Sequence, residues 1–342
     1  MVAVSAGAPS RCVRTEAADR RPGAARPATR FAGPRVGIDS SDISRPSRSF
    51  WIVATDGCPQ KAGLHRVAPC CRFLWWHFDE SGRCHPADAA HFGEIVPDDR
   101  PVCFVVHGSF VTMDQLVQDA VFATRWLRCG SGGTSTELVF FHWPSAGVTT
   151  LIPGRPLTAI APAIDVVELG KRADRNGAYL RQLLVGSARG RHVGLIGHSY
   201  GCRVIAAALQ GLSRCACGPG AVCDGPSRVR VVFAAAAVEH DWLNPGKRFG
   251  GALDCVDGVV NLRNRHDPIL KLFPLRYPFA SRALGVSGFT ARDRRVNGVR
   301  SARMLELDVS HLIGARHAWW SYYTQPGIAD SVARWILFAE ER

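Results

Sequence analysis

The sequence predicts an α/β fold in which helices cover both faces of a mostly parallel sheet. Short uninterrupted apolar runs, such as 101–108, are typical of strands that are buried on both sides. These runs alternate with longer segments whose apolar residues recur at helical spacing, as in 113–128. Because this alternation is characteristic of parallel strands joined by crossover helices, we expect one α/β domain over 49–342.

Eight strands are expected along this domain. The first two are rich in aromatic residues and are separated by Gly, Pro and Cys, as in an opening hairpin. The later strands are continuous apolar runs bounded by polar or turn-forming residues. The expected strands are 50–55, 73–78, 101–108, 137–145, 192–199, 230–238, 258–264 and 303–310. The expected helices, chosen by their apolar period, are 113–128, 164–186, 200–212 and 327–341.

The first 48 residues differ in composition from the rest of the chain. They are rich in Ala, Pro, Arg and Ser and have neither strand nor helix periodicity, so we expect 1–48 to be a disordered basic tail. The whole chain of 342 residues carries a net charge of +13. Its basic residues are almost all arginines scattered along the sequence, whereas nucleic-acid binders cluster basic residues on one element. We therefore expect no nucleic-acid partner.

Targeting and metal-binding signals are weak. No apolar run approaches the ~20 residues of a membrane-spanning helix, and the first residues lack the pattern of a secretory signal. We expect a cytoplasmic protein without stable membrane insertion, and the sequence leaves its oligomeric state open. Cys215, Cys217 and Cys223 lie in a Gly- and Pro-rich segment, 213–228. Their spacing and the lack of a neighbouring His fit zinc sites poorly, so a loop without metal is expected.

The strongest chemical signal is the sequence GHSYG at 197–201. It matches G-x-S-x-G, follows an apolar strand and continues into a helical segment. A serine in such a turn has a strained backbone, and the residues two before and two after it must be small, which Gly197 and Gly201 satisfy. The turn also places the hydroxyl at a helix N-terminus, where developing negative charge is stabilised. We therefore expect Ser199 to be a nucleophile.

A nucleophilic serine needs a base and an acid, which follow it along the chain in this arrangement. Asp267 lies just after the strand 258–264 and is the preferred acid. Asp241, after the preceding strand, is the alternative, whereas Asp308 is expected inside the last strand. His317 is the preferred base because it stands on a longer loop than His311, the alternative.

The loop after the strand 101–108 is a candidate for part of an oxyanion hole. One oxyanion-hole amide comes from this loop in such folds, and the other comes from the residue after the nucleophile. The expected donors are therefore the amide of Tyr200 and that of Ser109 or Phe110.

The chain resembles the α/β-hydrolase superfamily in four features: the His-Gly pair at 107–108, the GHSYG turn, Asp267 and His317. More narrowly, the chain is similar to uncharacterised bacterial serine hydrolases with a strand that ends in WPS, here 140–145. The resemblance covers about 50–342 and implies an eight-stranded, mostly parallel sheet and hydrolysis of an ester-like bond without a cofactor. The Cys-rich segment 213–228 and the basic tail are not features of that family.

Two functions follow from these observations. The first is a serine hydrolase that cleaves a small-molecule carboxylic ester, in the manner of an esterase or lipase, through an acyl-enzyme. The second is a non-catalytic protein of the same fold that acts in binding or scaffolding. The distance of a histidine from Ser199 separates them, because only an enzyme needs the base within hydrogen-bonding reach.

Overall fold

The structure is a computed structural model, which describes residues 48–59, 72–132, 135–146, 161–215, 225–276 and 280–339. The expected tail 1–48, apart from its last residue, lies outside these ranges, as do Cys217 and Cys223. Cys215 is the last residue of a helix. Within the described ranges, no helix is both long enough and apolar enough to cross a membrane.

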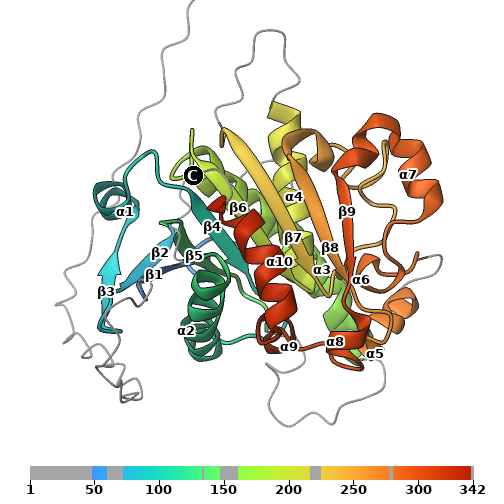
Figure 1. The fold of residues 1–342 in the computed structure, drawn as a ribbon, viewed down its shortest axis with the longest axis horizontal. Coiled ribbons are helices and arrows are strands. Elements are labelled where there is room, and N and C mark those ends of the chain that lie inside the picture. The colour runs from blue at the N-terminus through green and yellow to red at the C-terminus, as the bar shows by residue number, and fades with distance from the viewer. Residues whose placement is uncertain are drawn as a thin grey trace, which may run out of the picture. The chain divides into compact units, whose positions relative to one another are not determined.

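In the part of the chain that the structure describes, nine strands form one sheet (Figure 1). From one edge to the other they are β3 (Cys84–Ala87), β2 (Leu74–Phe78), β1 (Phe50–Ala54), β5 (Glu137–His142), β4 (Val102–Val106), β6 (His192–His198), β7 (Arg228–Ala234), β8 (Gly258–Arg263) and β9 (Met304–Asp308). The pairings β1–β2 and β2–β3 are antiparallel, and the pairings from β1 through β9 on the other side are all parallel. The expected α/β class, with a mostly parallel sheet, is confirmed.

The sheet has one strand more than the eight expected, and the additional strand is β3. Its sequence, Cys-His-Pro-Ala, has no apolar alternation, and its first three residues are exposed. Pro86 has no backbone N–H to donate to a neighbouring strand, so it is tolerated only at the edge of a sheet. Because β3 lies exposed at the edge of the sheet, it needs no apolar pattern, and the search for apolar runs did not predict it.

The helices form two layers, one on each face of the sheet (Figure 1). One face is covered by α2 (Met113–Gly130) and α10 (Pro326–Ile336), with the short α9 (Trp320–Tyr323) beside them. The other face is covered by α3 (Ala161–Val185) and α4 (Tyr200–Cys215). The last helix, expected to end at 341, ends at Ile336. The shorter helices are α1 (Ala89–Ile95), α5 (Pro268–Lys271), α6 (Leu284–Ser287), α7 (Ala291–Asn297) and α8 (Ser310–Ile313), and 3-10 turns lie at Ala252–Cys255, Phe273–Arg276 and Gly298–Arg303.

The parallel register brings the loops that hold the candidate site residues to one edge of the sheet. Val106 at the end of β4 pairs with Gly197 in β6. The last residues of β8 and β9, Arg263 and Asp308, pair with one another. Because parallel strands share a direction, the loops after β4, β6, β8 and β9 emerge side by side, at the edge where ligands bind in open α/β sheets.

Candidate active site

Ser199 lies between β6 and α4 in a sharp turn. Its φ of 52° is in the left-handed region, which a residue with a side chain rarely adopts. The two glycines of the motif are required by space. A Cβ on Gly201 would lie 2.2 Å from the carbonyl oxygen of Val106, and one on Gly197 would lie 2.8 Å from the amide nitrogen of Cys202. Strand, turn and helix are therefore packed so closely that no side chain fits at either glycine.

The structure brings Ser199, His317 and Asp267 together. Nε2 of His317 lies 3.1 Å from Oγ of Ser199, and Nδ1 of His317 lies 2.7 Å from Oδ2 of Asp267. The Asp267 carboxylate is fully buried. Its other oxygen accepts hydrogen bonds from the amides of Ile269 and Leu270, each at 3.0 Å, at the start of α5. Both carboxylate oxygens are thus engaged, which fixes the orientation of the group that faces the imidazole.

Two further residues hold the loop that carries His317. The side-chain amide of Asn264, at the end of β8, donates to the carbonyl oxygens of Gly314 at 2.8 Å and Arg316 at 3.2 Å. Nε2 of His198 lies 2.7 Å from the carbonyl oxygen of His317. Burial, together with the nearby His317, lowers the pKa of His198 to about 3. His198 is therefore neutral at pH 7, and its Nε2–H donates to this carbonyl. Asn264 was not predicted from the sequence, where its only signal is its position three residues before Asp267.

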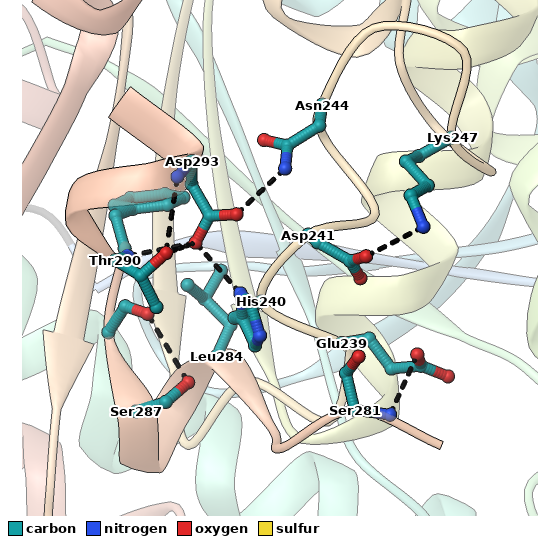
Figure 2. A network of polar contacts seen from close by, with 12 residues as sticks. Glu239, His240, Asp241, Asn244, Lys247, Ser281, Leu284, Ser287, Thr290 and Asp293 are labelled. Atoms are coloured by element: carbon teal, nitrogen blue, oxygen red, sulfur yellow. Dashed lines mark hydrogen bonds and ion pairs between the residues drawn. The ribbon is translucent and has the colours of Figure 1, made fainter. Parts of the chain in front are cut away.

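The alternative acids have other partners. Oδ2 of Asp241 lies 2.9 Å from Nζ of Lys247, and Figure 2 shows this pair beside a separate polar cluster. Oδ1 of Asp308 accepts from the amide of Ser310, and its Oδ2 pairs with Arg265 at 2.9 Å. Neither carboxylate is directed to the histidine beside Ser199.

The alternative base lies on the surface of a different element. His311 is an exposed residue of the short helix α8. Of the two candidate histidines, His317 is therefore the one that the structure places within hydrogen-bonding distance of Ser199.

The candidate oxyanion loop, residues 107–110, lies against Ser199. A Cβ on Gly108 would lie 3.1 Å from the Cβ of Ser199, so this residue is close to the serine and has no room for a side chain. The amide of Phe110 donates to the carbonyl oxygen of Ser145 at 2.9 Å and is therefore engaged with another loop. The amide of Tyr200 belongs to the first residue of α4, directly after Ser199.

No metal-binding cluster of three or more His, Cys, Asp or Glu residues occurs among the residues described.

Comparison with known proteins gives one distant likeness. No protein-family model matches the chain, and no curated protein matches it either. Among solved structures, the chain is similar to a crystal structure of esterase B from Lactobacillus rhamnosis with a tributyrin phosphonate inhibitor. The TM-score is 0.34 and the identity 12%, over 88% of this chain and 91% of the other. At this distance the likeness carries no argument about the reaction.

Proposed function

We propose that the protein is a serine hydrolase that cleaves carboxylic esters through an acyl-enzyme, without a cofactor. The observation that carries the proposal is the continuous hydrogen-bonded line from Ser199 through His317 to the buried Asp267. A serine hydroxyl is a weak nucleophile unless a neutral imidazole takes its proton. A carboxylate on the far nitrogen of that imidazole holds the reactive tautomer and stabilises the imidazolium that forms.

In the first half-reaction, Ser199 Oγ attacks the ester carbonyl carbon while His317 Nε2 accepts the hydroxyl proton. The carbonyl π electrons move to oxygen and give a tetrahedral oxyanion. When the C–O bond to the alcohol breaks, His317 returns its proton to the leaving oxygen. In the second half-reaction, water takes the place of Ser199 as nucleophile, and the acid leaves with Ser199 restored.

The oxyanion is assigned to the amides of Tyr200 and Ser109. The proposal leaves out the amide of Phe110, because that N–H already donates to Ser145. The close approach of Gly108 to Ser199 supports a donor from the next residue of the same loop. Each such donor contributes roughly 3 kcal/mol of transition-state stabilisation.

A fluorophosphonate probe tests the nucleophile. The wild-type protein is expected to be labelled once and to hydrolyse p-nitrophenyl esters, and a series of increasing acyl chain length measures the preferred acid. Ser199→Ala is expected to abolish both labelling and turnover. A folded wild-type protein that is neither labelled nor active on the series contradicts the proposal.

The two histidines after β9 provide a matched test of the base. His317→Ala is expected to lower kcat by roughly 10⁴- to 10⁶-fold, as removal of the base does in serine hydrolases. His311→Ala, an exposed residue six positions earlier, is expected to leave kcat near the wild-type value. Equal losses in the two variants would show that His317 is not the base.

The alternative of a non-catalytic binding or scaffold protein is not favoured by a specific observation. That function would be favoured by the lack of a histidine within hydrogen-bonding reach of Ser199. Instead, Nε2 of His317 lies 3.1 Å from Oγ of Ser199.

A further inference from the structure

Two buried histidines lie behind the oxyanion loop, and neither belongs to the proposed catalytic triad. His107 directly follows β4, and His142 is the last residue of β5. These strands are parallel neighbours, with Val106 paired to Phe141, so the next residue along each strand is also adjacent. Nε2 of His107 lies 3.0 Å from Nδ1 of His142, and both rings are buried.

The hydrogen bonds around His107 assign its proton. The backbone amide of Trp143 donates to His107 Nε2 at 3.2 Å, so this nitrogen is an acceptor. Burial, together with the nearby His142, lowers the pKa of His107 to about 3, and the ring is neutral at pH 7. The single ring proton therefore lies on Nδ1, which contacts the carbonyl oxygen of Gly108 at 2.8 Å.

The same acceptor assigns the proton of His142. Because Nε2 of His107 carries a lone pair, the facing Nδ1 of His142 must carry a proton to form the 3.0 Å contact. The other nitrogen of His142 faces the carboxylate of Asp56 at 3.5 Å. His142 is thus bonded through its Nδ1–H to the imidazole behind the oxyanion loop.

The bond from His107 to Gly108 acts on the peptide that supplies the proposed oxyanion donor. In a trans peptide the carbonyl and the N–H point in opposite directions, so holding the Gly108 carbonyl on one side directs the Ser109 N–H to the other. Gly108 has no Cβ, and its backbone rotates more readily than that of other residues. The peptide therefore needs an external restraint, and the imidazole provides it.

A second bond supports the same geometry. The indole Nε1–H of Trp143 donates to the carbonyl oxygen of His107 at 2.9 Å, and the indole and imidazole rings are nearly parallel, at 10°. The peptides on both sides of Gly108 are thus restrained, one by Trp143 and the other by His107.

We propose that His142, acting through His107, is a positioning residue that orients the Gly108–Ser109 peptide so that the Ser109 amide faces the oxyanion. The inference rests on the proposed function, because an oxyanion forms only if Ser199 attacks an ester. His142 contacts no substrate. Its contribution is made only when charge develops on the carbonyl oxygen, so it is expected in kcat and not in KM.

Two substitutions at position 142 separate positioning from packing. His142→Phe keeps a ring and removes the donor, whereas His142→Asn places an amide N–H near the position of Nδ1. With p-nitrophenyl acetate, and with active sites counted by fluorophosphonate labelling, His142→Phe is expected to lower kcat by roughly 10- to 100-fold at unchanged KM. This is less than the roughly 100- to 1000-fold loss on removal of an oxyanion donor. His142→Asn is expected to recover most of the loss.

His77→Phe is the matched control, because His77 lies in β2 and stacks on Trp51, with ring centroids 4.2 Å apart. This variant is expected to keep the wild-type kcat. If His142→Phe does not fold, His142→Gln takes its place, because its amide reaches the position of Nε2 rather than Nδ1.

Three results would overturn the inference. One is a wild-type kcat in His142→Phe. Another is an equal loss of kcat in the Phe and Asn variants, which would indicate packing alone. An active wild-type enzyme with either result leaves the proposed function intact. A folded wild-type protein that is neither labelled nor active overturns both proposals together.

Discussion

The two oxygens of Asp267 serve different neighbours, and this division determines what its substitution does. Oδ2 contacts His317, and Oδ1 caps the first turn of α5. Asparagine is as good an N-cap as aspartate, so Asp267→Asn keeps the cap, but its amide cannot hold the imidazole in the reactive tautomer. Activity and stability therefore separate at this one position.

We expect Asp267→Asn to lower kcat by roughly 10⁴-fold, by the tautomer argument. The free energy of unfolding, measured in urea, is expected to change by less than about 1 kcal/mol because the cap is retained. Asp241→Asn is the control, since Asp241 pairs with Lys247, and its kcat is expected to stay near wild type. A comparable loss of kcat in both variants would contradict the assignment of Asp267.

At the scale of elements, the turn between β6 and α4 depends on close contact with β4. Gly201 is the point of contact, because a Cβ there would lie 2.2 Å from the Val106 carbonyl oxygen and 2.6 Å from that of His107. Any side chain would push α4 away from β4 and move Ser199 relative to the oxyanion loop. Gly201 is thus required by the packing of β6, α4 and β4 against one another, and not only by the local geometry of the turn.

Gly201→Ala is expected to lower the free energy of unfolding by about 1–3 kcal/mol, the usual cost of overpacking, and to lower kcat as well. Gly93→Ala in α1 is the control. A Cβ on Gly93 meets nothing within 4 Å, so alanine is expected to raise stability by about 0.5–1 kcal/mol, as in other helices. Urea denaturation of both variants provides the test, and an unaffected Gly201→Ala would contradict the steric argument.

At the scale of the whole molecule, a polar network joins segments that are distant in the sequence. Asp293 in α7 is buried, and its carboxylate contacts His240 at 2.7 Å and accepts from Asn244 at 2.7 Å, both in the segment after β7 (Figure 2). Thr290 completes the cap of α7. Burial by itself raises the pKa of Asp293, but these hydrogen bonds, led by that of Thr290, outweigh it and lower the pKa.

The direction of this shift predicts an acid-sensitive contribution to stability. A lowered folded pKa means that the ionised Asp293 stabilises the protein above the unfolded pKa, about 3.9 for Asp. That contribution is lost as the pH falls through the folded value. Asp293→Asn is therefore expected to cost about 1–3 kcal/mol at pH 7 and less at pH 3, measured in urea.

The exposed Asp330 provides the control for this prediction. Asp330→Asn is expected to change the free energy of unfolding little at either pH. A cost in Asp293→Asn that is the same at pH 7 and pH 3 would show that the network does not depend on the ionised carboxylate.

Much of the fold could be predicted because its signals are local. Strands buried on both faces must be continuously apolar, and the turn at Ser199 must be flanked by glycine, so both features can be recognised within a few residues. The edge strand β3 could not be recognised in this way, because a strand exposed at the sheet edge needs no apolar pattern and holds a proline.

The candidate site was only partly accessible from the sequence. Chain order and loop position led to Ser199, Asp267 and His317, but left Asp241 and His311 as alternatives. What separates them is contact between distant segments: Lys247 engages Asp241, and Asn264 holds the loop that ends at His317. In the same way, Ser145 engages the amide of Phe110, and His142 lies behind the oxyanion loop. Such pairings depend on which strands are neighbours in the sheet, so they are decided by tertiary packing, whereas the nucleophile turn is decided by the backbone geometry of five consecutive residues.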